Sequence, residues 1–241
     1  MAHENKEPLD IILFSEVMYD QKREISGENP EHIQFIKDTK SLFEGWGYEV
    51  HILRADMDYL GFFNRIITKA TKHKEHNGMK FGFPLFGLCG LKRDCKEKPI
   101  KNYLKTIEEG TIQYVGICAD EKKRLESLHK ESSRVSLLEK YGYTEGMARE
   151  KCLEYGLLSP VYQLSKRGGC WFCPNAKLAE HKAIRELYPE IWKEFVSLEN
   201  ENNVANDKWN LYKSTLHEID ERLFWEERQM EIFDYIEMVD A

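Results

Sequence analysis

The first half of the chain alternates apolar runs with segments whose apolar residues recur every three or four positions. Residues 9–15, LDIILFS, form a β-favouring apolar run, which is typical of a strand buried on both faces of a parallel sheet. Residues 30–45 have apolar side chains at helical spacing, with Asn29 as the expected N-cap and Pro30 in the first turn. The same alternation predicts further strands at 48–54 and 111–117 and further helices at 57–71 and 98–109. This order predicts an α/β fold with a doubly wound, mostly parallel sheet.

The second half of the chain has a mostly helical pattern. Thr144 is the expected cap of a helix over 145–155, which Gly156 ends. More helices are expected after residue 175, the last over roughly 207–238. We therefore expect an α/β nucleotide-binding-like domain over residues 1–140 and, over 141–241, a Cys-x-x-Cys loop with a helical C-terminal part.

Composition and charge narrow the class of protein. The opening residues, MAHENKEPLD, lack the apolar core of a signal peptide, and no apolar run approaches the roughly 20 residues of a membrane span. A net charge of −7 argues against a large nonspecific nucleic-acid surface. We expect a cytoplasmic protein without a membrane partner, so its six cysteines are core residues, metal ligands or reactive thiols rather than a disulfide framework.

Four of these cysteines lie in two glycine-containing loops. Cys170 and Cys173 flank Trp171 and Phe172 in GGCWFCPNA, and the earlier loop, LCGLKRDCKEKPI, carries Cys89 and Cys95. A redox pair is disfavoured because a thioredoxin-like setting near the N-terminus is absent. A structural turn and a metal site remain as alternatives. Four thiolates can close a tetrahedral zinc site or hold a [4Fe–4S] cluster.

Several segments resemble the sulfonucleotide (PAPS/APS) reductases and, more broadly, the PP-loop adenine-nucleotide alpha-hydrolase superfamily. The similarity covers roughly residues 9–200. It rests on SPVYQLSKRGGCWFCP, on VGICADEKKR, on CKEKPIKNYL and on IILFSEVMYD with the following PEHIQFI. These segments are similar to the family's Gly-Cys-x-x-Cys segment, nucleotide-site segment, Lys-x-x-Pro helix start, and second strand and helix.

The resemblance implies a metal centre and a nucleotide site. It places Cys89 or Cys95, with Cys170 and Cys173, where members of the family hold a [4Fe–4S] cluster. The upstream cysteines are spaced differently from the family's adjacent pair, so for a site of Cys89, Cys95, Cys170 and Cys173 zinc stays the alternative. It places an adenine nucleotide, ATP or a relative, on Arg93, Lys96, Asp120, Glu121 and Arg124. Cys118 stands where the family has Arg and Lys122 where it has Ser, which weakens a phosphate contact at that segment.

Two family features are missing from the sequence. No cysteine follows Cys173, so the thiol that attacks a sulfonucleotide has no counterpart and reduction of that substrate is not expected. The SGGxDS pyrophosphate loop is also missing, so we expect a truncated or degenerate member that binds ATP weakly or not at all.

The sequence leaves two functions open. The first is an adenine-nucleotide-dependent sulfur-transfer or adenylating enzyme, with a nucleic acid or a small molecule as acceptor and with catalytic residues unknown. The alternative is a non-catalytic, metal-stapled binding or scaffold module. Without a neighbouring strand, residues 9–15 would be exposed, so we expect either self-association into a homo-oligomer or cover from the last helix.

Overall fold

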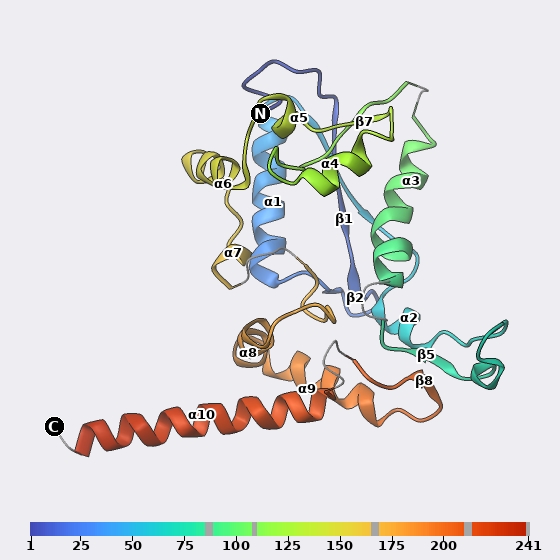
Figure 1. The fold of residues 1–241 in the computed structure, drawn as a ribbon, viewed down its shortest axis with the longest axis vertical. Helices are drawn as coiled ribbons and strands as arrows, with labels where there is room; N and C mark the ends of the chain where they lie inside the picture. The colour runs from blue at the N-terminus through green and yellow to red at the C-terminus, as the bar shows by residue number, and fades with distance from the viewer. Residues whose placement is uncertain (85–88, 108–109, 165–168, 210–213, 240–241) are drawn as a thin grey trace.

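A parallel strand pair flanked by helices forms the middle of the protein. The computed structural model describes residues 1–84, 89–107, 110–164, 169–209 and 214–239. Strand β1 (Ile11–Glu16) pairs in parallel with β4 (Glu49–Arg54), and Glu16 lies opposite Arg54 at their carboxyl ends. Figure 1 shows β1 between α1 (Pro30–Gly45) and α3 (Lys98–Leu104). Helix α1 packs against β4, and α3 packs against both strands.

The remaining elements are mostly short. The strands are β2 (Met18–Asp20), β3 (Ile25–Ser26), β5 (Lys80–Gly82), β6 (Gln113–Tyr114), β7 (Arg134–Val135) and β8 (Val204–Asn206). The helices are α2 (Tyr59–Asn64), α4 (Lys122–Leu128), α5 (Leu137–Lys140), α6 (Glu145–Glu154), α7 (Val161–Leu164), α8 (Leu178–Leu187), α9 (Pro189–Ser197) and α10 (Leu216–Val239). Two 3-10 turns, η1 (Lys74–His76) and η3 (Leu198–Asn200), and a π-helical segment, η2 (Lys92–Glu97), complete the set.

The α/β class expected from the sequence is confirmed, but a doubly wound sheet is not. Within the described residues the strands form two-stranded sheets, of which β1–β4, β5–β8 and β6–β7 are parallel and β2–β3 is antiparallel. None of the helices in these residues is long and apolar enough to cross a membrane.

The two N-cap residues expected from the sequence are confirmed. Asn29 Oδ1 accepts a hydrogen bond from the Glu31 N–H at 2.9 Å, and α1 spans the expected residues. Thr144 caps α6 by accepting from the Met147 N–H at 3.3 Å. Side-chain oxygens at these positions satisfy N–H groups that have no partner within the helix.

Four expected elements are shorter by several residues in the structure. Helix α3, expected over 98–109, ends at Leu104. Helix α2 stops at Asn64, because the next residues are extended and Ile66 bridges to Lys80. The strand expected at 111–117 is reduced to β6. The helix expected from about 207 begins at Leu216.

The main core is aromatic and lies beyond the carboxyl end of β1. Its fully buried members include Tyr19, Tyr59, Phe172, Phe195 and Trp209. These residues come from both of the expected domains, whose division at residue 140 stays a prediction. The first turns of α10 also enter this core, and Figure 1 shows the rest of α10 running past α8 and α9, away from β1. Helix α10 therefore does not cover β1, which in the described part of the chain pairs with β4 alone.

Candidate functional site

The carboxyl ends of β1 and β4 are the natural place for a ligand in this fold, because open α/β sheets bind ligands at that edge. Figure 1 shows α1 and α3 both beginning at this end of β1, close to β2. Glu16, the last residue of β1, is buried and accepts a hydrogen bond from Arg54 Nε at 2.8 Å. The two cysteine loops meet at the same end of the sheet.

The Cys-x-x-Cys loop is anchored by the two aromatic residues between its cysteines. The Trp171 backbone N–H donates to the Gly27 carbonyl at 2.9 Å, and its indole N–H donates to the Ser26 carbonyl at 3.0 Å. The Phe172 carbonyl accepts from the Trp209 indole at 3.1 Å. A Cβ on Gly27 would lie 2.6 Å from the Phe172 ring, so only glycine allows this close approach.

Cys89 precedes the first turn of the helix that leads through η2 into α3. Gly90 lies so close to Phe62 that a Cβ there would be 2.8 Å from the ring. Burial raises the pKa of the Cys89 thiol, while the backbone N–H groups of Lys92 and Leu91 act in the opposite direction. Such N–H groups at a helix start stabilise a thiolate once the proton is lost.

The two loops bring three thiols together. Cys89 and Cys170 both pack against the aromatic core. Burial is the main cause of the raised pKa of Cys170, and its interactions with Cys173 and Cys89 add to the effect. Cys173 in turn contributes to the raised pKa of Cys89. The thiols of Cys89, Cys170 and Cys173 therefore lie close enough to interact electrostatically.

Cys95 occupies a different setting. Its residue is fully buried, and its Sγ donates to the Met57 carbonyl at 3.2 Å. Burial, followed by the carboxylates of Asp94 and Asp58 and then by the Cys89 thiol, raises the pKa of this thiol to about 12. The structure therefore places Cys95 in the core, with its proton in use as a hydrogen-bond donor.

The donor set fits a metal held by thiolates, although the sulfurs are not yet arranged as a closed site. Of the four cysteines, all within the described residues, no three sulfurs lie within 4.8 Å of one another. Burial favours the neutral thiols of Cys89 and Cys170, and a bound cation would replace their protons. Cys89, Cys170 and Cys173 are the residues whose placement fits this exchange.

Buried Glu28 is a site residue that the sequence did not reveal. It follows Gly27 and precedes the Asn29 cap, is 3% exposed, and lies 3.8 Å from Lys96 Nζ through its Oε1. Burial raises its pKa, Lys96 acts against this, and Glu16 adds to it. No motif marks this residue, because a sequence does not show which side chains the fold buries.

The five expected nucleotide contacts fall into two groups. Lys96 faces Glu28, and Arg93 lines a cavity of about 620 Å³ beside η2 and α3. The cavity has charged walls formed by Arg54, Asp56, Arg65, Arg93, Asp94 and Lys98.

The second group, Asp120, Glu121 and Arg124, makes hydrogen bonds and ion pairs within its own part of the fold. Asp120 accepts from the Glu145 N–H at 3.2 Å, and Glu121 pairs with Arg124 at 2.5 Å. Figure 1 shows α4, which follows these residues, beside β7 and α5 and far from the first turn of α3. The structure does not bring the two groups together, so their joint role stays a prediction.

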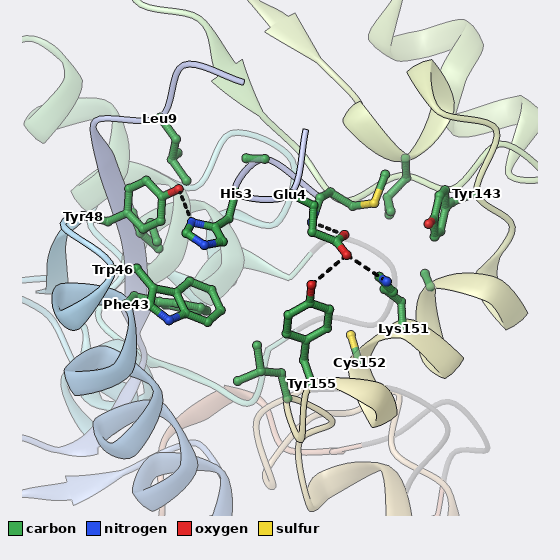
Figure 2. A pocket seen from close by; sticks show the side chains of 16 residues that line it. His3, Glu4, Leu9, Phe43, Trp46, Tyr48, Tyr143, Lys151, Cys152 and Tyr155 are labelled. Atoms are coloured by element: carbon green, nitrogen blue, oxygen red, sulfur yellow. Dashed lines mark hydrogen bonds and ion pairs between the residues drawn. The ribbon is translucent and has the colours of Figure 1, made fainter. Parts of the chain in front are cut away.

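A second cavity of about 310 Å³ lies at the other end of β1. Figure 2 shows its apolar wall, which includes Phe43 and Trp46, and the polar residues at its rim. Glu4 accepts from Lys151 Nζ at 2.8 Å and from the Tyr155 hydroxyl at 2.7 Å. Because these rim groups pair with one another, we assign the cavity no chemistry.

One other group of residues has metal-ligand spacing. The ligand atoms of His73, Glu75 and His76 lie within 4.8 Å of one another, on an exposed turn. Lys72 precedes these residues in the sequence and Lys74 lies between His73 and Glu75, and both would repel a cation. We assign this turn no function.

Comparison with known proteins gives no relative. No family model matches the chain, and neither a curated protein nor a solved structure matches it significantly. The class that fold and site define is thus an α/β protein with a cysteine-rich site at the carboxyl ends of its central strands.

Proposed function

We propose that this protein is a metal-binding member of the PAPS-reductase-like, adenine-nucleotide alpha-hydrolase class that performs nucleotide-dependent sulfur transfer or adenylation. Its short parallel strand pairs would belong to the doubly wound sheet of that class. Its six free cysteines fit a reducing compartment, so we place it in the cytoplasm. Sulfonucleotide reduction is not part of the proposal, because no cysteine follows Cys173.

One observation carries the proposal: two loops distant in sequence bring Cys89, Cys170 and Cys173 together at the carboxyl end of β1. Three half-buried thiols near a buried carboxylate form a donor set that a cation would stabilise. The metal would supply Lewis acidity or a structural clamp beside the nucleotide.

The charged cavity next to this site supports the nucleotide part of the proposal. Arg65, Arg93 and Lys98 line it within reach of one ligand, and phosphate groups are the anions that such cations bind. Nearby Asp94 already pairs with Arg93 at 2.7 Å. An entering phosphate would have to compete with this carboxylate, which limits the affinity.

A non-catalytic, metal-stapled scaffold is the second candidate. The observation in its favour is that Asp120, Glu121 and Arg124 serve local structure, and α4 lies far from the start of α3 (Figure 1). Turnover of ATP by the metal-loaded protein would support the enzyme, and metal binding without turnover would support the scaffold.

Anaerobic purification followed by metal analysis tests the shared part of both candidates. We expect one metal centre per chain, lost in Cys170→Ser and retained in the control Cys152→Ser, whose thiol lies on α6. Because metal binding is coupled to folding, the Cys170 variant should also melt at a lower temperature. A wild-type protein without metal, or a Cys170 variant with unchanged metal content, would refute the proposal.

A further inference from the structure

The structure bears on which residue is the fourth ligand of the metal site. The sequence assigns this role to Cys95, but that thiol is fully buried and donates to the Met57 carbonyl. The Cys95 backbone is also held by a hydrogen bond, since the Cys95 carbonyl accepts from Ser15 Oγ at 3.3 Å. For Cys95 to become a ligand, its side chain would have to leave the core. The Met57 carbonyl would then lose its hydrogen-bond donor.

Glu28, unlike Cys95, has a side-chain atom without a hydrogen-bond partner. It is 3% exposed, and its Oε1 has no hydrogen-bond partner. The nearest cation, Lys96 Nζ, is 3.8 Å away, which is too far for a hydrogen bond. A buried carboxylate oxygen with no donor is costly unless a cation binds it.

The backbone places Glu28 between the two cysteine loops. Its neighbour Gly27 accepts from the N–H of Trp171, the residue after Cys170. On its other side Lys96 belongs to η2, in the helix that Cys89 precedes. Glu28 is therefore next in sequence to the residue that hydrogen-bonds the Cys-x-x-Cys loop, and its own carboxylate pairs with the helix that follows Cys89.

We propose that Glu28 is the fourth ligand, so that Cys89, Cys170, Cys173 and Glu28 bind one zinc ion and Cys95 has a structural role only. The inference rests on the metal centre of the proposed function. Zinc accepts carboxylate oxygen beside thiolate sulfur in tetrahedral sites. A [4Fe–4S] cluster is held by cysteine thiolates, so a set of three sulfurs and one oxygen favours zinc. Lys96 offsets part of the negative charge.

Zinc affinity and the cobalt spectrum of the full chain distinguish the two ligand sets. We compare wild type with Glu28→Gln, Cys95→Ala and the control Glu31→Gln, whose carboxylate is exposed in the first turn of α1. We expect Cys95→Ala and Glu31→Gln to bind one zinc per chain as wild type does. Glu28→Gln should bind zinc more than about tenfold more weakly, because even residues outside the ligand shell cost about 10–100-fold. Cobalt-loaded wild type should show charge-transfer intensity for three thiolates.

Each other outcome has a separate meaning. Loss of zinc from folded Cys95→Ala, unchanged affinity in Glu28→Gln, or a cobalt spectrum of four thiolates would overturn the inference. So would the absorbance of an iron–sulfur cluster in the anaerobically purified protein, although the proposed metal centre would then stand. If wild type binds no metal at all, the proposed function itself fails. The cobalt spectrum of wild type keeps the test decisive even if Glu28→Gln does not fold.

Discussion

Replacing Gly27 by alanine tests whether the Cys-x-x-Cys loop docks as described. The added Cβ would lie 2.6 Å from both the Phe172 ring and the Val17 carbonyl. Phe172 cannot move aside cheaply, since it is buried against Tyr59 with ring centroids 4.3 Å apart. Overpacking of this kind costs about 1–3 kcal/mol.

Two glycines provide matched controls. A Cβ on Gly45, at the end of α1, or on Gly169, immediately before Cys170, would meet nothing within 4 Å. Neither has the positive φ that would strain an alanine, so both substitutions should change the free energy of unfolding by less than about 1 kcal/mol.

Urea unfolding, followed by tryptophan fluorescence with a chelator present, measures the difference. For a slope of about 2–3 kcal/mol/M, Gly27→Ala should lower the midpoint by about 0.3–1.5 M. The controls should stay close to wild type. If Gly27→Ala unfolds at the wild-type midpoint, Phe172 does not pack on this glycine and the docking of the loop is refuted.

Two further predictions concern protonation and nucleotide binding. The hydrogen bond from Lys151, and then that from Tyr155, lowers the pKa of Glu4 to about 2, so its stabilising effect is full above pH 4.5 and is lost as the pH falls towards 2. Glu4→Gln should therefore flatten the pH dependence of the melting temperature between pH 5 and 2, and an identical profile in both proteins would contradict the assignment. In calorimetry we expect ATP to bind with a Kd weaker than about 1 μM, since the sequence lacks a glycine loop to hold the phosphates. Tighter binding that is lost in Arg93→Ala would show that the charged cavity suffices.

Local signals were enough to predict the parts of the fold that depend on neighbours in sequence. Asn29 and Pro30 fixed the start of α1 because capping is a contact between adjacent residues. The early end of α2 was not predictable in this way, since it depends on Ile66 pairing with Lys80. Here a contact between residues distant in sequence overrides the helix propensity of the residues after Asn64.

In the candidate site, too, features set by neighbours in sequence were predictable and features set by distant contacts were not. Spacing and chemistry marked Cys170 and Cys173, and the structure brings Cys89 to them. The settings of Glu28 and Cys95 were not predictable, because a sequence does not reveal which side chains are buried and which hydrogen bonds they make. In the structure Glu28 is buried, and the Cys95 thiol is buried and donates to the Met57 carbonyl.

The π-helical segment η2 has a consequence for how this protein tolerates insertions and deletions. The Lys98 N–H bonds to the Arg93 carbonyl, five residues back, so η2 contains one residue more than an α-helix would need. A π-helical segment turns by less per residue than the about 100° of an α-helix, so it holds one extra residue while the two ends of the helix keep their relative orientation. Deleting one residue of η2 would therefore leave an α-helix in which the Cys89 end and the end that carries Lys98 and Pro99 still face as they do here. Related chains one residue shorter in this segment should therefore keep both the thiol cluster and the charged cavity.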